Sequence, residues 1–180
     1  MPIHSRPRSG GRLHLPNQES NSGLEAHNGN AIAFLRISVG ILFLIFGQYK
    51  VFGGDFTRGG GFQYWINRFL QDGAYPFMVP VLKGFVLRHA PGIAYLVAYG
   101  ELMIGISLLI GVWSRVASAF GFVYMITLLF SSNYPGAHTP FWQYFGASLD
   151  HSVLALCFLT LLMGDPELRL SVKHLRYDPR

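Results

Sequence analysis

YLVAYGELMIGISLLIGVW, residues 95–113, is an apolar stretch with a single carboxylate, Glu101, near its middle. Its length is close to the ~20 residues that an α-helix needs to cross the hydrocarbon core of a bilayer. An isolated charge in hydrocarbon costs on the order of several kcal/mol, so Glu101 must be paired, protonated or hydrated. The stretch therefore predicts a membrane-spanning helix with a candidate functional acid. The alternative is a structural role, in which Glu101 ties two helices together through a basic partner.

The composition places the whole chain in the same class. Of its 180 residues, 51% are hydrophobic, 15% are aromatic and only 13% are charged, which is far from the balance of a soluble domain. Four stretches approach spanning length, namely 31–48, 92–113, 116–131 and 147–163. We therefore expect an all-α integral membrane protein whose single domain, residues 31–163, is a four-helix bundle in the lipid bilayer.

The ends of the chain are polar and basic. Residues 1–30 are rich in Gly, Pro, Ser, Asn and Arg and contain no signal-peptide core, so we expect a disordered arm there. Residues 164–180 form a basic tail, and Arg115 lies between the second and third stretches, whereas the loop 131–146 has no Lys or Arg. By the positive-inside rule, this distribution predicts that both termini are cytoplasmic.

The long first loop contains an amphipathic segment, FQYWINRFLQD, residues 62–72. Its apolar residues recur at helical spacing, at Phe62, Trp65, Ile66, Phe69 and Leu70. This pattern predicts an interfacial helix. A second apolar piece, residues 77–86, contains Pro80 and is too short to span, so the first loop should be partly helical and roof one end of the bundle.

Small residues repeat along two of the predicted spans, as Gly40 and Gly47 in the first and Gly105 after Glu101 in the second. Such stripes allow helices to approach closely. At ~1.5 Å per residue, Arg36 and Glu101 should lie roughly 8 and 15 Å from the cytoplasmic edge, a difference that an arginine side chain can bridge. We therefore expect a structural ion pair between Arg36 and Glu101.

Most other polar groups of the spans fall in the outer half of the predicted bundle. An apolar cleft with a few converging polar groups suits an amphipathic head group such as a quinone. Glu101 and His151 are the candidate catalytic residues, because they can exchange protons. The candidate ligand-binding residues are Gln48, Lys50 and Asp150, covered by Trp65 and Phe69. The alternative is that these groups are interfacial residues and helix contacts without a ligand.

Several chemistries have no signature in the sequence. Cys157 is the only cysteine, so this chain alone has neither a disulfide nor a Cys-x-x-Cys motif. There is no phosphate-binding loop, dinucleotide fingerprint or metal-ligand cluster, and we expect no metal and no nucleic-acid partner. His151 has no second histidine beside it at helical spacing, which disfavours haem ligation.

Two blocks of sequence resemble the DoxX family of small four-helix bacterial membrane proteins. They are AFLRISVGILFLIFGQYKVF, residues 33–52, and YGELMIGISLLIGVWSRVAS, residues 99–118, within a resemblance that covers residues 31–163. The family includes the membrane subunit of thiosulfate:quinone oxidoreductase. The resemblance implies a multi-pass protein of the bacterial inner (plasma) membrane. It also implies a quinone as cofactor, and other membrane or redox proteins as partners.

On this interpretation the chain is the membrane subunit of a redox complex that interacts with the quinone pool, and a partner supplies the electron carrier. Two alternatives remain open. The first is a non-catalytic structural or assembly subunit of a larger membrane complex. The second is a protein that handles a small solute or lipid in a cavity at Glu101.

Overall fold

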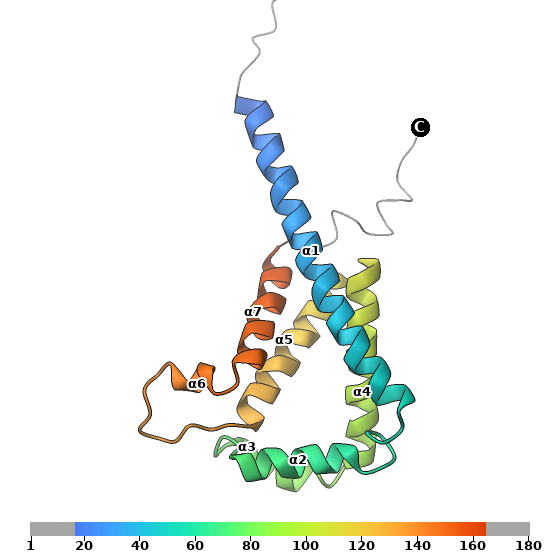
Figure 1. Ribbon diagram of the computed structural model, residues 1–180, viewed down its shortest axis with the longest axis vertical. Helices are drawn as coiled ribbons and strands as arrows, with labels where there is room; N and C mark the ends of the chain where they lie inside the picture. The colour runs from blue at the N-terminus through green and yellow to red at the C-terminus, as the bar shows by residue number, and fades with distance from the viewer. Residues whose placement is uncertain (1–16, 165–180) are drawn as a thin grey trace, which may run out of the picture.

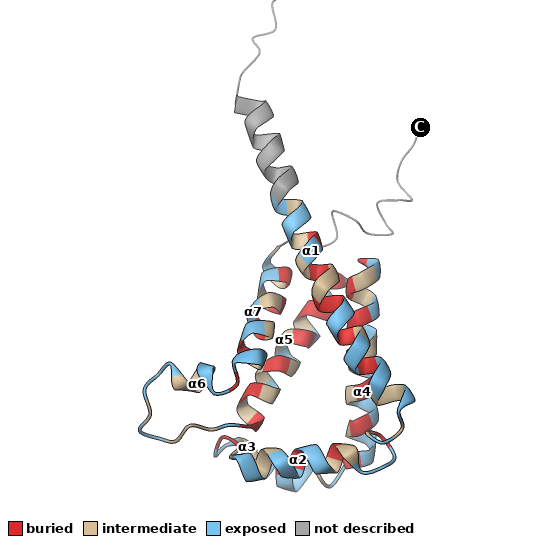
Figure 2. Ribbon diagram, viewed as in Figure 1, coloured by how far each residue is buried: buried red, intermediate tan, exposed pale blue. Residues whose placement is uncertain are grey.

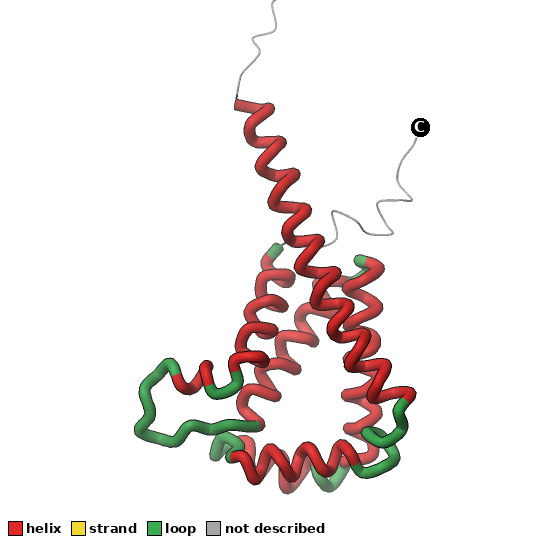
Figure 3. The backbone as a smooth tube through the Cα atoms, in the orientation of Figure 1, coloured by secondary structure: helices red, strands yellow, loops and turns green. Residues whose placement is uncertain are grey.

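The computed structural model describes residues 17–164, which form helices and connecting loops and contain no β-strand (Figures 1 and 3). The all-α prediction is therefore confirmed. The elements in chain order are α1 (Asn17–Phe52), α2 (Gly61–Asp72), α3 (Met78–Val81), the π-helical turn η1 (Leu82–Val86), α4 (Ala90–Ile110), α5 (Ser114–Ser131), α6 (Gln143–Gly146) and α7 (Leu149–Met163).

Three helices are long and apolar enough to cross a membrane, namely residues 28–52 of α1, α4 and α5. The fourth, α7, is apolar but has 15 residues. At ~1.5 Å per residue it is about 22 Å long, shorter than the ~30 Å hydrocarbon core. The predicted four-helix bundle is thus present with one short member.

Helix α1 begins at Asn17, so the expectation of a disordered arm over residues 1–30 is wrong for residues 17–30. Extending an existing helix adds one hydrogen bond per residue without a new nucleation cost, which explains how a polar segment continues the first span. Residues 1–16 and all of the basic tail after Gly164 lie outside the described residues.

The bundle consists of two closely packed pairs, α1 with α4 and α5 with α7, which the short α4–α5 turn joins at one end (Figure 1). Buried residues of all four helices form one core that includes Val39, Phe43, Leu108 and Phe158. The same helices expose large apolar side chains, among them Phe34, Leu96, Phe120 and Leu156. Figure 2 shows how buried and exposed residues are distributed along the helices. A bilayer would cover this exposed apolar surface, as expected for an integral membrane protein.

Glycines set the closeness of the α1–α4 pair. Gly40 lies against Gly105 and Leu108, and Gly47 lies against the backbone of Glu101 and Leu102, which shows that the two helices run antiparallel. Without side chains at these positions, the backbones approach closely, as in other membrane helix pairs with small residues at the contact.

The first loop covers the end of the bundle opposite the α4–α5 turn, where α2 lies across the helix ends (Figure 1). Phe62 and Ile66 of α2 are buried against a cluster that includes Leu82 and Ala94. The amphipathic helix predicted for this loop is present at residues 61–72. A backbone bond from Tyr75 N to Phe130 O (3.1 Å) joins the first loop to the end of α5, and a bond from Tyr134 N to Gly73 O (2.7 Å) joins the first loop to the third.

Candidate functional site

Glu101 lies at the centre of a hydrogen-bonded group contributed by three helices. The Lys50 ammonium of α1 lies 2.5 Å from Glu101 Oε1, and the Tyr124 hydroxyl of α5 donates to the same oxygen at 2.6 Å. The side chains of Glu101 and Lys50 are 7% and 20% exposed. The charge of the buried carboxylate is therefore balanced by a cation from α1, and α5 adds a neutral donor.

The close approach of α1 and α4 explains why Lys50 is the partner. Gly47 lies directly against Glu101 and Leu102, and Lys50 follows one helical turn later on the same side of α1. Arg36 is 11 residues from Gly47, or about 16 Å along the helix at ~1.5 Å per residue. The predicted Arg36–Glu101 ion pair is therefore wrong, because antiparallel packing places Arg36 beside a different part of α4.

Arg36 instead lies at the C-terminal end of α4, fully buried. Its Nη1 donates to the backbone oxygen of Leu108 at 2.7 Å, one of the carbonyls that the helix end leaves without an intrahelical donor. The Ser107 hydroxyl donates to Val112 O, and Gly111 ends the helix with a φ of 70°. A cation at a helix C-terminus also interacts favourably with the helix dipole, so Arg36 stabilises the α4–α5 turn.

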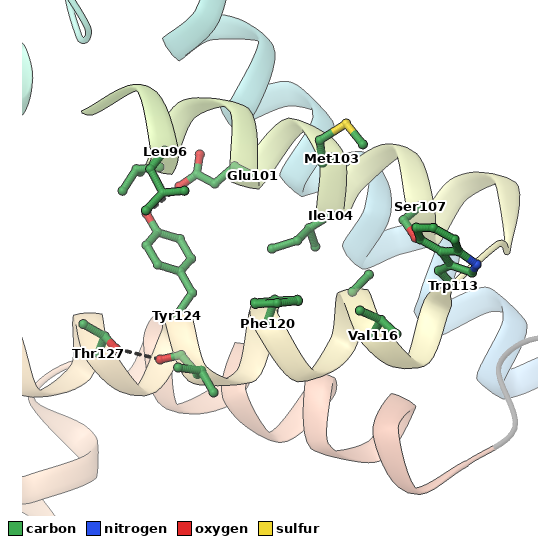
Figure 4. Close-up of a pocket in the computed structure, with 14 residues that line it drawn as sticks. Leu96, Glu101, Met103, Ile104, Ser107, Trp113, Val116, Phe120, Tyr124 and Thr127 are labelled. Atoms are coloured by element: carbon green, nitrogen blue, oxygen red, sulfur yellow. Dashed lines mark hydrogen bonds between the residues drawn. The ribbon is translucent and has the colours of Figure 1, made fainter. Parts of the chain in front are cut away.

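A cavity of about 530 Å³ lies between α4 and α5. Figure 4 shows Glu101 and Tyr124 at one end and Trp113 at the other. Its lining residues are Leu96, Val97, Gly100, Glu101, Met103, Ile104 and Ser107 of α4, Trp113, and Val116, Ala117, Phe120, Val123, Tyr124 and Thr127 of α5. Leu96, Met103 and Phe120 are 72%, 62% and 67% exposed, so the cavity opens on the surface that faces lipid.

The structure brings together only part of the site predicted from the sequence. Lys50 and Glu101 meet, and Glu101 lines the cavity. Gln48 is exposed and Trp65 is 51% exposed, and neither lines the cavity. Phe69 packs against the buried cluster that includes Phe62, Ile66, Leu82 and Ala94.

Asp150 and His151 lie near the start of α7, away from this group. His151 Nδ1 is 3.3 Å from Asp150 Oδ1 without hydrogen-bond geometry, and the Asp150 side chain is 72% exposed. Among the described residues, no hydrogen bond or ion pair joins either residue to Glu101. Their predicted roles in catalysis and ligand binding remain predictions.

Tyr124 is the site residue that sequence reasoning missed. It lies inside the apolar run of α5, where an aromatic residue is usually interpreted as packing. Its hydroxyl group could have indicated a role in the site, since a tyrosine hydroxyl within an apolar span normally has a hydrogen-bond partner.

The arrangement can hold an amphipathic molecule with its polar group at Glu101 and Tyr124 and its apolar part along α4 and α5. The carboxylate can also accept a proton from such a ligand. Across residues 28–164, no group of three or more His, Cys, Asp or Glu lies close enough together to hold a metal ion.

The comparison with protein-family models matches residues 31–133 to the DoxX family, which covers more than half of the chain and includes Lys50, Glu101 and Tyr124. No curated protein matches the chain, and no solved structure matches it.

Proposed function

Because this chain belongs to the DoxX family of membrane proteins, we propose that it is the membrane subunit of a redox complex and binds a quinone between α4 and α5. The observation that supports this most directly is the cavity of about 530 Å³, apolar along its length and polar at Glu101 and Tyr124. Ligand pockets commonly have volumes of roughly 300–1,000 Å³ and a few well-placed polar groups. A quinone has the matching shape, with a polar ring and an apolar tail.

The opening of the cavity toward lipid fits a ligand that arrives from the bilayer. Leu96, Met103 and Phe120 form part of its rim and are exposed. Glu101 would exchange the proton that accompanies quinone chemistry, with Lys50 and Tyr124 holding its carboxylate in place. A partner protein would exchange the electrons with the quinone: protons enter the ligand when it gains electrons and leave it when it loses them. The alternative is a non-catalytic structural or assembly subunit.

A cavity-filling variant tests the site. Gly100 lines the cavity beside Glu101, and a Cβ added there would meet nothing within 4 Å, so Gly100→Leu should occupy the cavity without displacing backbone. We expect it to weaken binding of a decyl-tailed ubiquinone analogue, offered in both redox forms, by at least about tenfold, or ~1.4 kcal/mol. Equilibrium binding to purified protein in detergent or nanodiscs is the measurement.

Two controls sharpen this experiment. Gly92 lies in the same helix, outside the cavity, and a Cβ added there would also meet nothing within 4 Å. The Gly92→Leu protein should therefore bind the analogue as tightly as the unchanged protein does. His151→Asn should also leave binding of the analogue unchanged. Weaker binding by this variant would instead favour the site that the sequence predicted in the outer half of the bundle, which included His151. If the unchanged protein binds neither redox form, the quinone proposal fails and the structural-subunit alternative replaces it.

We also propose that the protein lies in the bacterial inner membrane with both termini in the cytoplasm. The basic residues near the termini and the uncharged third loop support this orientation, and the bond from Tyr134 N to Gly73 O keeps the first and third loops at one end of the bundle. Reporters fused after Gly136 and after Arg180 should therefore report opposite compartments, outside and cytoplasmic. Readings from the same compartment would contradict the four-span topology.

A further inference from the structure

The hydroxyl groups that line the cavity already donate their protons to the protein. Tyr124 donates to Glu101 Oε1 at 2.6 Å, Thr127 donates to Val123 O at 2.8 Å, and Ser107 donates to Val112 O. A hydroxyl has one proton and two acceptor lone pairs. What these three groups still offer to a ligand is therefore their capacity to accept a hydrogen bond.

The Glu101 end of the cavity adds more acceptor capacity. Lys50, the nearest cation, does not line the cavity, and its ammonium contacts Glu101 Oε1. The Lys50 nitrogen also lies 5.0 Å from the centre of the Phe56 ring. Glu101 Oε2 is buried and accepts no hydrogen bond from any described residue. The Trp113 indole, whose N–H is a donor, lies at the far end of the cavity (Figure 4).

From this inventory we infer that the site favours the reduced form of its ligand, a quinol with two hydroxyl groups, over the oxidised quinone with two carbonyls. A quinol O–H can donate to the Tyr124 oxygen or to the Glu101 carboxylate, whose terminal torsion is broad. A quinone carbonyl can only accept, so at this end it would face other acceptors and lose the hydrogen bonds that water gave it. This inference rests on the proposed function and names the redox form that the site selects.

The test is to measure binding of the same decyl-tailed ubiquinone analogue to the purified protein in its oxidised form and, without oxygen, in its chemically reduced form. We expect the quinol to bind at least about tenfold more tightly. Glu101→Gln should bring the two affinities closer by strengthening quinone binding, because the amide N–H₂ can donate to a carbonyl. Gly92→Leu, which lies outside the cavity, should keep the preference of the unchanged protein.

Each outcome distinguishes the two proposals. If both forms bind equally, or the quinone binds more tightly, the inferred preference is wrong and the quinone site itself stands. If neither form binds, the proposed function fails. A decyl alcohol that binds as tightly as the quinol would show that the site recognises a lipid hydroxyl in general, which would overturn the quinol assignment.

Discussion

Valine in place of Gly47 or Gly105 should prevent α1 and α4 from packing together. A Cβ added to Gly47 would lie 2.5 Å from Leu102 N, and one added to Gly105 would lie 2.6 Å from Leu44 N. These neighbours are backbone atoms, which cannot move aside as a flexible side chain can. We expect a loss at or above the upper end of the ~1–3 kcal/mol typical of overpacked cores. The yield of monodisperse protein and its melting temperature are the measurements.

The same helix provides the control. Gly92 also lies in α4, and a Cβ there would meet nothing within 4 Å, so Gly92→Val should change the melting temperature little. Because Gly47 sets the position of Lys50 beside Glu101, both destabilising variants should also separate that ion pair. If Gly105→Val protein melts at the temperature of the unchanged protein, the close contact between α1 and α4 is incorrect.

The sequence predicted the helices well because long apolar stretches have few alternatives in a membrane. The stretch 92–113 corresponds to α4 at Ala90–Ile110, and 116–131 corresponds to α5 at Ser114–Ser131. The small-residue stripes also predicted close approach between the helices of Gly47 and Gly105, which the structure confirms.

The relative positions of residues on neighbouring helices were harder to predict. The estimate that paired Arg36 with Glu101 assumed that depth follows from the edge of each apolar stretch. The contact of Gly47 with Leu102 instead places Lys50 at Glu101 and Arg36 at Leu108. Sliding α1 along α4 by two helical turns, about 11 Å, would therefore change which cation, Lys50 or Arg36, lies beside Glu101. Hydropathy does not encode this alignment of the two helices.

The cavity between α4 and α5 was beyond prediction for a related reason. Its position depends on two helix pairs that diverge from a shared turn, whereas a sequence pattern describes one helix at a time. Asp150 and His151 were grouped with Glu101 because all three are polar groups assigned to the outer half. Their place in the bundle depends on how α7 packs, and α7 packs mainly against α5.

Removing both members of the Lys50–Glu101 pair should destabilise the protein by less than the sum of the two single losses. The Glu101 side chain is 7% exposed in the unchanged protein, and Lys50→Met would leave its carboxylate with only the Tyr124 hydroxyl as donor. Glu101→Gln would leave the Lys50 ammonium without its counter-ion. Each single change should cost roughly 3–5 kcal/mol, as for other buried pairs that lose one partner. The double variant should be more stable than the sum of the two losses implies, by about 0.5–3 kcal/mol. Unfolding measured in one detergent for all four proteins provides this double-mutant cycle.

A second cycle in the same experiment separates this pair from the one that the sequence predicted. Arg36 donates to Leu108 O and makes no ion pair with Glu101, so Arg36→Met and Glu101→Gln remove different interactions. Distant sites with no shared partner add to within roughly 0.3–0.5 kcal/mol. The losses from Arg36→Met and Glu101→Gln should therefore add, while those from Lys50→Met and Glu101→Gln should not. The opposite result would restore the Arg36–Glu101 pair and would mean that α1 and α4 pack about two turns away from the alignment set by Gly47.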